Sequence, residues 1–295
     1  MRMMIDAFLD YLQFELNRSA LTVLSYGDDL RAFETHFKNK DTQLSWETVD
    51  ADIIRDWMES MMDKGCNATS VNRRLSALRS FYRFALMRGW VEKSPMQKVV
   101  GPKRARPLPQ FVREKEMNRL LDDIPCGESF KEVLAYTMIL TFYTTGIRLA
   151  ELVGLDNPDV DFVNQVMKVT GKRSKQRLIP FGEELANGLK RYIALRDKIA
   201  PRQSSALFVT EDGARVTRSL VQRKVQEGLS KVTTLKKKSP HVLRHTFATA
   251  MLNHEAGLES VKKLLGHESL STTEIYTHTT FEQLKKVYNQ AHPRA

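Results

Sequence analysis

The C-terminal part of the chain contains Ser239-Pro-His241-Val-Leu-Arg244-His-Thr-Phe-Ala-Thr249, followed by Leu264-Leu-Gly-His267 and Tyr276-Thr-His278. Serine followed by proline predicts a helix start, because serine caps free backbone N–H groups and proline fits the first helical position. His241 and Arg244 are three residues apart and therefore share one helical face near that start. A helix N-terminus and a guanidinium fork both favour a phosphate. With a second histidine and a phenol, the stretch is suited to attack on a phosphodiester without a metal.

Three further helices are predicted around these residues. Leu258–Leu265 is closed by Gly266, so that His267 begins a turn. Ser271-Thr-Thr-Glu274 matches a capping box and opens a helix with Tyr276 in its second turn. The chain then continues from Phe281 as a short amphipathic helix.

The charge of the chain indicates a polyanionic partner. The formal net charge is +11 and the pI is about 9.6, a surplus that favours fast, salt-sensitive binding to nucleic acid. Four runs contain basic residues and no acid: Arg73 to Arg88, Lys98 to Arg106, Lys168 to Arg177, and Lys231 to Lys238. One such run is typical of a solvated surface, but four favour nucleic acid as the partner.

The first ninety residues are predicted to be helical. The expected helices are Ile5–Leu16, Ala20–Phe37, Asp52–Asp63 and Ser70–Arg88. The last has an apolar stripe of Val71, Leu75, Leu78, Tyr82 and Leu86, and its arginines fall largely off that stripe. This basic face either follows a DNA backbone or keeps the helix solvated.

Four prolines and a glycine between Ser94 and Pro109 cannot continue a helix and predict a basic linker. We therefore expect domains at residues 1–93 and 110–295, joined by residues 94–109. In the second domain we expect helices from near Arg113, at Lys131–Tyr143 and from near Gly146. Strands are expected at Gln165–Val169 and Gln176–Pro180, joined by a loop with three cations, and the remainder is expected to be helical.

Each candidate residue also has a simpler interpretation. Tyr276 on a short helix is typical of a core or interface residue, and His267 after glycine could be a capping residue. Arg148 could only pair with Glu151. His241 and His245, four residues apart, resemble a zinc pair, but no third ligand spacing accompanies them.

Taken in order, the motifs resemble those of the tyrosine recombinase family, and most closely its bacterial Xer type. The similarity covers essentially the whole chain and includes Thr145-Gly-Ile-Arg148-Leu-Ala-Glu151-Leu152 and Thr170-Gly-Lys172 with Lys175, Arg177 and Pro180. It implies that the catalytic residues are Arg148, Lys172, His241, Arg244, His267 and the nucleophile Tyr276. The chain departs from the family pattern at Arg173, which stands where the hairpin commonly has glycine.

The resemblance implies a mainly α fold with a small β-sheet in the catalytic domain, preceded by a SAM-like helical domain, the two forming a C-shaped DNA clamp. It implies a 3′-phosphotyrosine intermediate, so that religation needs no ATP, and we expect no metal or other cofactor. Two arginines are suited to hold the nonbridging oxygens, His267 or His241 to accept the phenol proton, and Lys172 to protonate the leaving oxygen.

The expected partners follow from the same resemblance. They are a double-stranded DNA recombination site, a homo- or hetero-tetramer with a second recombinase, and a septal DNA translocase as activator. The terminal helix is expected to dock into a neighbouring subunit; the alternative is packing on its own domain. Candidate DNA contacts are Arg73, Arg74, Arg79, Arg83, Lys103, Arg104 and Lys175, and bases are expected to be read around Arg73–Arg88 and near Arg215–Arg223.

Several functions fit these features. Compact length and the absence of an arm-binding domain favour chromosome-dimer resolution at a terminus site, through a Holliday junction. A phage or mobile-element integrase is the main alternative, followed by a type IB topoisomerase and a non-catalytic DNA-binding protein. Acids near the N-terminus and the lack of a long apolar run predict no export and no membrane insertion, so we expect a cytoplasmic, nucleoid-associated protein. Cys66 and Cys126 fit a reducing compartment.

Overall fold

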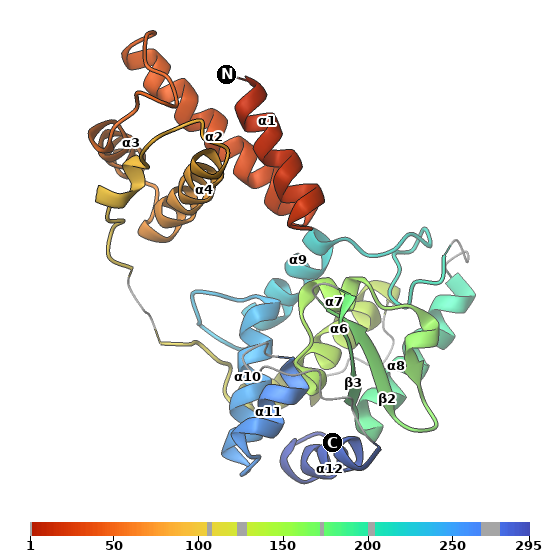
Figure 1. The fold of residues 1–295 in the computed structure, drawn as a ribbon. Helices are drawn as coiled ribbons and strands as arrows, with labels where there is room; N and C mark the ends of the chain where they lie inside the picture. The colour runs from red at the N-terminus through yellow and green to blue at the C-terminus, as the bar shows by residue number, and fades with distance from the viewer. Residues whose placement is uncertain (1, 105–107, 123–128, 172–173, 200–203, 267–277) are drawn as a thin grey trace. The chain divides into compact units, whose positions relative to one another are not determined.

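The computed structural model describes residues 2–104, 108–122, 129–171, 174–199, 204–266 and 278–295 (Figure 1). The chain divides into two compact units, Met1–Pro107 and Leu108–Ala295. Each unit has a hydrophobic core of its own. The prediction of a mainly helical fold with a small sheet is confirmed.

The first unit is built from helices α1 (Arg2–Asp10), η1 (Tyr11–Glu15), α2 (Ala20–Lys40), α3 (Ala51–Asp63), α4 (Ala68–Met87) and η2 (Pro95–Lys98). The four helices predicted from the sequence are confirmed. Three of them begin at short polar side chains, since Ser19, Asp50 and Asn67 each accept a hydrogen bond from a backbone N–H in the following turn. Local capping chemistry therefore sets where these helices start.

Aromatic side chains form the centre of the first unit's core. The rings of Trp46 and Phe81 are 4.4 Å apart between centroids, and the buried Tyr82 hydroxyl donates to the carbonyl of Trp46 over 3.2 Å. The predicted apolar stripe of α4 is buried except at Leu86, which is 37 % exposed. At 100° per residue, Leu86 lies about 60° around the helix from Val71, at the edge of the buried face.

The first part of the predicted linker packs on the helical unit. Met96 and Val99 are buried. Two side chains of α4 also donate hydrogen bonds to backbone carbonyls of this segment. Asn72 donates to the carbonyl of Pro102 over 2.8 Å, and Arg79 donates to that of Val99 over 3.3 Å. The segment from Ser94 to Pro102 is thus held against α4.

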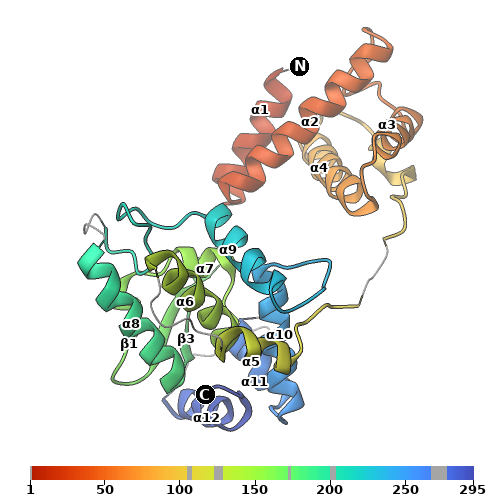
Figure 2. The same cartoon turned by 180° about the vertical axis from the view of Figure 1, so that it is seen from behind.

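The second unit contains helices α5 (Glu114–Asp122), α6 (Phe130–Thr145), α7 (Leu149–Val153), η3 (Asn157–Asp159), α8 (Glu183–Ile199), α9 (Arg218–Ser230), α10 (Pro240–Asn253), α11 (Leu258–Leu265) and α12 (His278–Ala291). Helix α6 is buried on nearly all sides and packs against α8, α9 and α10 (Figure 2). It ends at Gly146, whose φ of +60° is left-handed. The next helix, predicted near Gly146, begins at Leu149.

A three-stranded antiparallel sheet lies in the same unit, in the order β1 (Val160–Asp161), β2 (Val166–Thr170) and β3 (Gln176–Pro180). The β2–β3 hairpin confirms the two predicted strands, and its register sets Val169 opposite Arg177. Strand β1 was not predicted, because two residues are too few to show an alternating pattern.

Helix α12 packs against its own unit, beside α10 and α11 (Figure 2). Its buried residues Leu284 and Tyr288 join Phe247 and Leu264 in a small apolar cluster. Docking of this helix into a neighbouring subunit, expected from the sequence, is not the arrangement seen in this single chain. Among the described residues, no helix combines the length and apolar character needed to cross a bilayer.

Candidate active site

Arg148 is the N-cap residue of α7, and its backbone is extended. Its backbone N–H donates to Glu151 Oε2 over 2.7 Å and its Nη1 to Glu151 Oε1 over 2.9 Å. Its Nη2 donates to the carbonyl of Gly266 over 3.0 Å. The pairing with Glu151 considered from the sequence is therefore present. The side chain is still 43 % exposed, which leaves the guanidinium accessible to a substrate.

Glu151 is buried and is shared between two arginines. Arg177 binds its carboxylate through both terminal nitrogens, at 2.7 and 2.9 Å. Burial would raise the pKa of Glu151, but the hydrogen bonds and positive charge of Arg177, followed by the hydrogen bonds of Arg148, hold it at about 2. Glu151 is accordingly a permanent anion between the two guanidinium groups.

Arg177 belongs to one of the four basic runs that favour a nucleic-acid partner, but in the structure it is not part of the exposed basic surface. Its side chain is only 7 % exposed. The signal that could have placed it is the two-residue period of β3, which sets Arg177 on the same face as the buried Ile179.

Arg244 lies near the start of α10 and is buried, at 7 % exposure. Its Nη1 donates to the carbonyl of Gly146 over 2.7 Å and its Nη2 to that of Leu265 over 2.6 Å. Burial, together with the charges of Arg148 and Arg177, lowers the pKa of Arg244 to about 10. The Arg244 guanidinium remains a cation at neutral pH. The neighbouring positive charges favour the binding of an anion beside it.

The C-terminal end of α11 is where the three arginines meet. The carbonyls of Leu264, Leu265 and Gly266 accept hydrogen bonds from Arg177, Arg244 and Arg148, respectively. Carbonyls in the last turn of a helix have no partner within the helix. The arginines supply those partners, and they fix the residue that directly precedes His267 in the sequence.

His241 and His245 lie one turn apart on α10. The Nε2 atoms of these two histidines are 3.1 Å apart. One ring must donate and the other accept in this contact. Burial, followed by the proximity of His245 and Arg244, lowers the pKa of His241. Within the described ranges, no cluster of three or more metal-ligating side chains is found.

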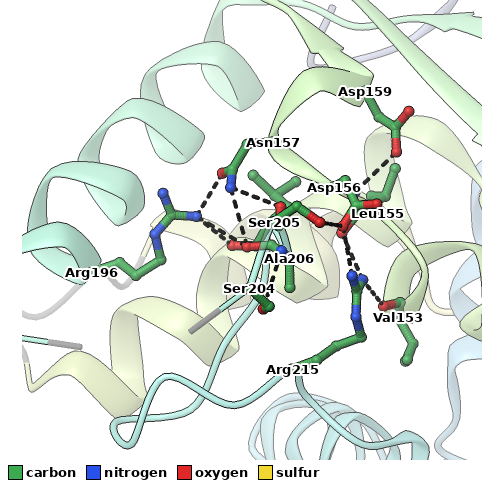
Figure 3. Close-up of polar contacts among 11 residues, drawn as sticks. Val153, Leu155, Asp156, Asn157, Asp159, Arg196, Ser204, Ser205, Ala206 and Arg215 are labelled. Carbon is green, nitrogen blue, oxygen red and sulfur yellow. Dashed lines mark hydrogen bonds and ion pairs between the residues drawn. The ribbon is translucent and has the colours of Figure 1, made fainter. Parts of the chain in front are cut away.

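A separate polar network anchors the other end of α7 (Figure 3). Arg215 donates to the carbonyls of Val153 and Leu155, at 2.9 and 3.0 Å, and pairs with Asp156 at 2.6 Å. Arg196 donates to Asn157 Oδ1 over 2.8 Å. Arg215 was expected near a base-reading segment; here it is engaged within its own unit and holds the helix that carries Arg148.

Three predicted catalytic residues, Lys172, His267 and Tyr276, lie outside the described residues. The described ends of the loop around Lys172 are joined, because the N–H of Gly171 donates to the carbonyl of Lys175 over 2.7 Å. Ser174 has a left-handed φ of +57°. From the predicted set, the structure brings Arg148 and Arg244 together at the end of α11, and His241 lies three residues before Arg244 on α10.

The candidate DNA contacts fall into two groups. Arg73 is bonded to the buried Asp29, with Nη2 2.7 Å from Oδ1, and Arg74 Nε lies 3.7 Å from the same carboxylate. With Arg79 held to the linker, these arginines have partners in their own unit. The other candidates, Arg83, Lys103, Arg104 and Lys175, are exposed, and Arg73 is also exposed despite its pairing with Asp29.

Replacing Gly146 with alanine is expected to destabilise this unit. The left-handed conformation would cost about 1–2 kcal/mol, and the new Cβ would stand 2.5 Å from Phe247 Cδ1, an overpacking cost of about 1–3 kcal/mol. The free energy of unfolding, measured in denaturant, should fall by roughly the sum. Gly89→Ala is the control, because Gly89 has a φ of +69° and no atom within 4 Å of where its Cβ would stand. Equal losses for both variants would contradict the predicted clash.

Comparison with known proteins shows which protein family has this architecture. Residues 110–283 match the phage integrase family, and residues 5–89 match the phage integrase N-terminal SAM-like domain. The chain is 38 % identical to tyrosine recombinase XerC of Chlorobaculum tepidum, over 99 % of this chain and 94 % of the relative. It is 36 % identical to tyrosine recombinase XerC of Vibrio vulnificus, over 100 % of this chain and 92 % of the relative.

Solved structures of recombinases and integrases share the fold, among them two that are bound to DNA. One is the XerH site-specific recombinase bound to a palindromic difH substrate, with a TM-score of 0.71, 20 % identity, and coverage of 96 % of this chain and 93 % of that one. The other is the Tn1549 transposon integrase with a circular intermediate DNA, with a TM-score of 0.72, 21 % identity, and coverage of 90 % and 91 %. The full-length identity to curated recombinases, joined to the arginine cluster, shows that the chain belongs to the phage integrase family and is a tyrosine-type site-specific DNA recombinase.

Proposed function

We propose that this recombinase resolves chromosome dimers, cutting and rejoining DNA at a terminus site through a Holliday junction. The observation that carries the proposal is the match to relatives named XerC along nearly the whole of both chains. The exposed basic residues of both units support contacts with the DNA backbone. The protein would act on chromosomal DNA at the nucleoid.

In the proposed mechanism, Arg148 and Arg244 stabilise the scissile phosphate. Negative charge grows on the nonbridging oxygens as phosphorus is attacked, and two permanent cations lie within one cluster to receive it. Before DNA arrives, Arg148 is held by Glu151 and by the carbonyl of Gly266, and Arg244 is held by the carbonyls of Gly146 and Leu265. This preorganisation means that little reorientation is needed in the transition state.

Tyr276 is proposed as the nucleophile. Its oxygen forms a bond to phosphorus while the bond to the 5′ oxygen breaks, which leaves a 3′-phosphotyrosine and conserves the phosphoester bond for religation. Ionising a phenol of pKa near 10 at neutral pH costs about 4 kcal/mol, so a proton acceptor is needed. We assign that role to His241 or His267, and we assign protonation of the leaving oxygen to Lys172.

We further propose that the active form is a tetramer on DNA, of this chain alone or with a second recombinase. Exchange of α12 between neighbours would then couple the sites, although α12 packs on its own unit in the single chain. A septal translocase as activator belongs to the same proposal. The mechanism assigns no step to a metal or to ATP.

Covalent capture tests the function. The wild-type chain is incubated with sheared host DNA in EDTA, denatured in detergent, and the attached DNA is sequenced. We expect adducts at one recurrent sequence near the replication terminus. Adducts at the boundary of a mobile element would contradict dimer resolution and favour integration as the function. Binding in a gel shift without any adduct would contradict catalysis by the chain alone.

A further inference from the structure

We propose that Arg177 is a positioning residue, which orients Arg148 for catalysis without touching the DNA. The inference rests on the proposed role of Arg148 at the scissile phosphate. Arg177 lies on β3 with its side chain 7 % exposed. All three of its side-chain nitrogens already donate to protein groups, and its positive charge is paired with the buried carboxylate of Glu151. Arg244 is equally buried but donates to uncharged carbonyls, so its charge remains available to a phosphate.

The two groups that bind the Arg148 guanidinium are both connected to Arg177. Arg148 binds Glu151 Oε1 through Nη1 and the carbonyl of Gly266 through Nη2. Arg177 binds both oxygens of Glu151, and its Nε donates to the carbonyl of Leu264 over 2.9 Å, two residues before Gly266. One buried side chain therefore fixes both the anion and the helix end that hold Arg148.

The carboxylate of Glu151 has no spare acceptor capacity. It receives two bonds from Arg148 and two from Arg177, and a carboxylate offers about four lone-pair sites. Removing Arg177 would empty half of these sites in a buried position. Glu151 would then shift toward other donors, and the guanidinium of Arg148 would lose its fixed orientation.

A lysine cannot reproduce this arrangement. Arg177 uses three donors in one plane, two on Glu151 and one on Leu264, whereas an ammonium is a compact charge without that fork. Gly171, which directly precedes Lys172, has a site for a Cβ 3.4 Å from Glu151 Oε1 and 3.9 Å from Arg177 Nη1. The pair therefore also borders the start of the loop that carries Lys172.

The test is Arg177→Lys, assayed on an oligonucleotide duplex carrying the captured site. Single-turnover cleavage at saturating DNA is expected to fall by about tenfold or more, which corresponds to ~1.4 kcal/mol in the barrier, with DNA affinity unchanged. The same measurement is made with a methylphosphonate at the scissile position. That group lacks the charge which Arg148 neutralises, so the defect relative to wild type should shrink. A partly unfolded protein would lose the same fraction on both substrates.

Arg148→Ala and Leu178→Thr complete the design. Arg148→Ala should show the same substrate dependence as Arg177→Lys, with a larger defect. Leu178 neighbours Arg177 on β3, points to the other face and is 40 % exposed, so Leu178→Thr should cleave like wild type.

The outcomes separate the two hypotheses. If Arg148→Ala cleaves normally, the proposed function fails. If Arg148→Ala is defective but Arg177→Lys is normal, or is equally defective on both substrates, the positioning role is wrong. Failure of both Arg177→Lys and Arg177→Gln to fold would also overturn it, because Arg177 would then serve the fold and not the orientation of Arg148.

Discussion

Replacing Tyr276 with phenylalanine is expected to abolish every covalent protein–DNA adduct while DNA affinity stays unchanged. The phenol oxygen is the atom proposed to attack phosphorus, and phenylalanine lacks it. No other group could form the same 3′-phosphotyrosine. The measurement is gel separation of adducts after incubation with a nicked duplex that traps the intermediate, beside a gel shift for affinity.

Tyr288→Phe is the matched control for this variant. Tyr288 lies on α12 and is fully buried in the apolar cluster that this helix forms with α10 and α11. Burial raises its pKa, which makes it a poor nucleophile. The variant should form adducts as wild type does. Adducts that persist in Tyr276→Phe, or vanish in Tyr288→Phe, would assign the nucleophile to the wrong residue.

Arg244→Lys is expected to lower the single-turnover cleavage rate by about 10²–10³, the loss typical when one preorganised donor to a developing oxyanion is removed. Arg244 donates from two nitrogens to the carbonyls of Gly146 and Leu265. Lysine keeps the charge but cannot hold both carbonyls and a phosphate oxygen in one plane. The rate is measured at saturating DNA, so that a change in affinity does not enter.

Arg196→Lys controls for the loss of stability that follows when a buried arginine is replaced. Arg196 is 5 % exposed and donates to the carbonyl of Leu207 over 2.8 Å, within the network that also contains Arg215 (Figure 3). Both variants should unfold at lower denaturant concentration, but Arg196→Lys should cleave at the wild-type rate. Similar losses of cleavage in both would reduce the role of Arg244 to a structural one.

The sequence predicted most helices well because their ends depend on local chemistry. Ser19, Asp50 and Asn67 cap helices of the first unit, and left-handed Gly146 and Gly266 end α6 and α11. These signals act within one turn of the chain and need no tertiary contact. The exposure of Leu86 was not predicted, because this residue lies at the edge of the buried helical face. Strand β1 was not predicted, because it is too short to show an alternating pattern.

Part of the candidate site could be predicted from the sequence, and part became known only from the tertiary structure. The sequence by itself predicted Arg148, His241 and Arg244 as site residues, because few residue types can bind a phosphate and their motifs lie in a fixed order. Lys172, His267 and Tyr276 stay predictions. The role of Glu151 as an anion shared by two arginines could not be predicted, since Arg177 lies 26 residues away on another element.

Charge shows the same division. The sequence by itself determined that the chain is basic, that it is mainly helical, and that it carries the motifs of a tyrosine recombinase. Only the tertiary structure decided which arginines have partners within their own unit: Arg73 pairs with Asp29, Arg177 with Glu151, and Arg215 donates to backbone carbonyls. The physical reason is that buried charges such as Asp29, Glu151 and Arg177 must be paired, and folding brings their partners from distant parts of the chain.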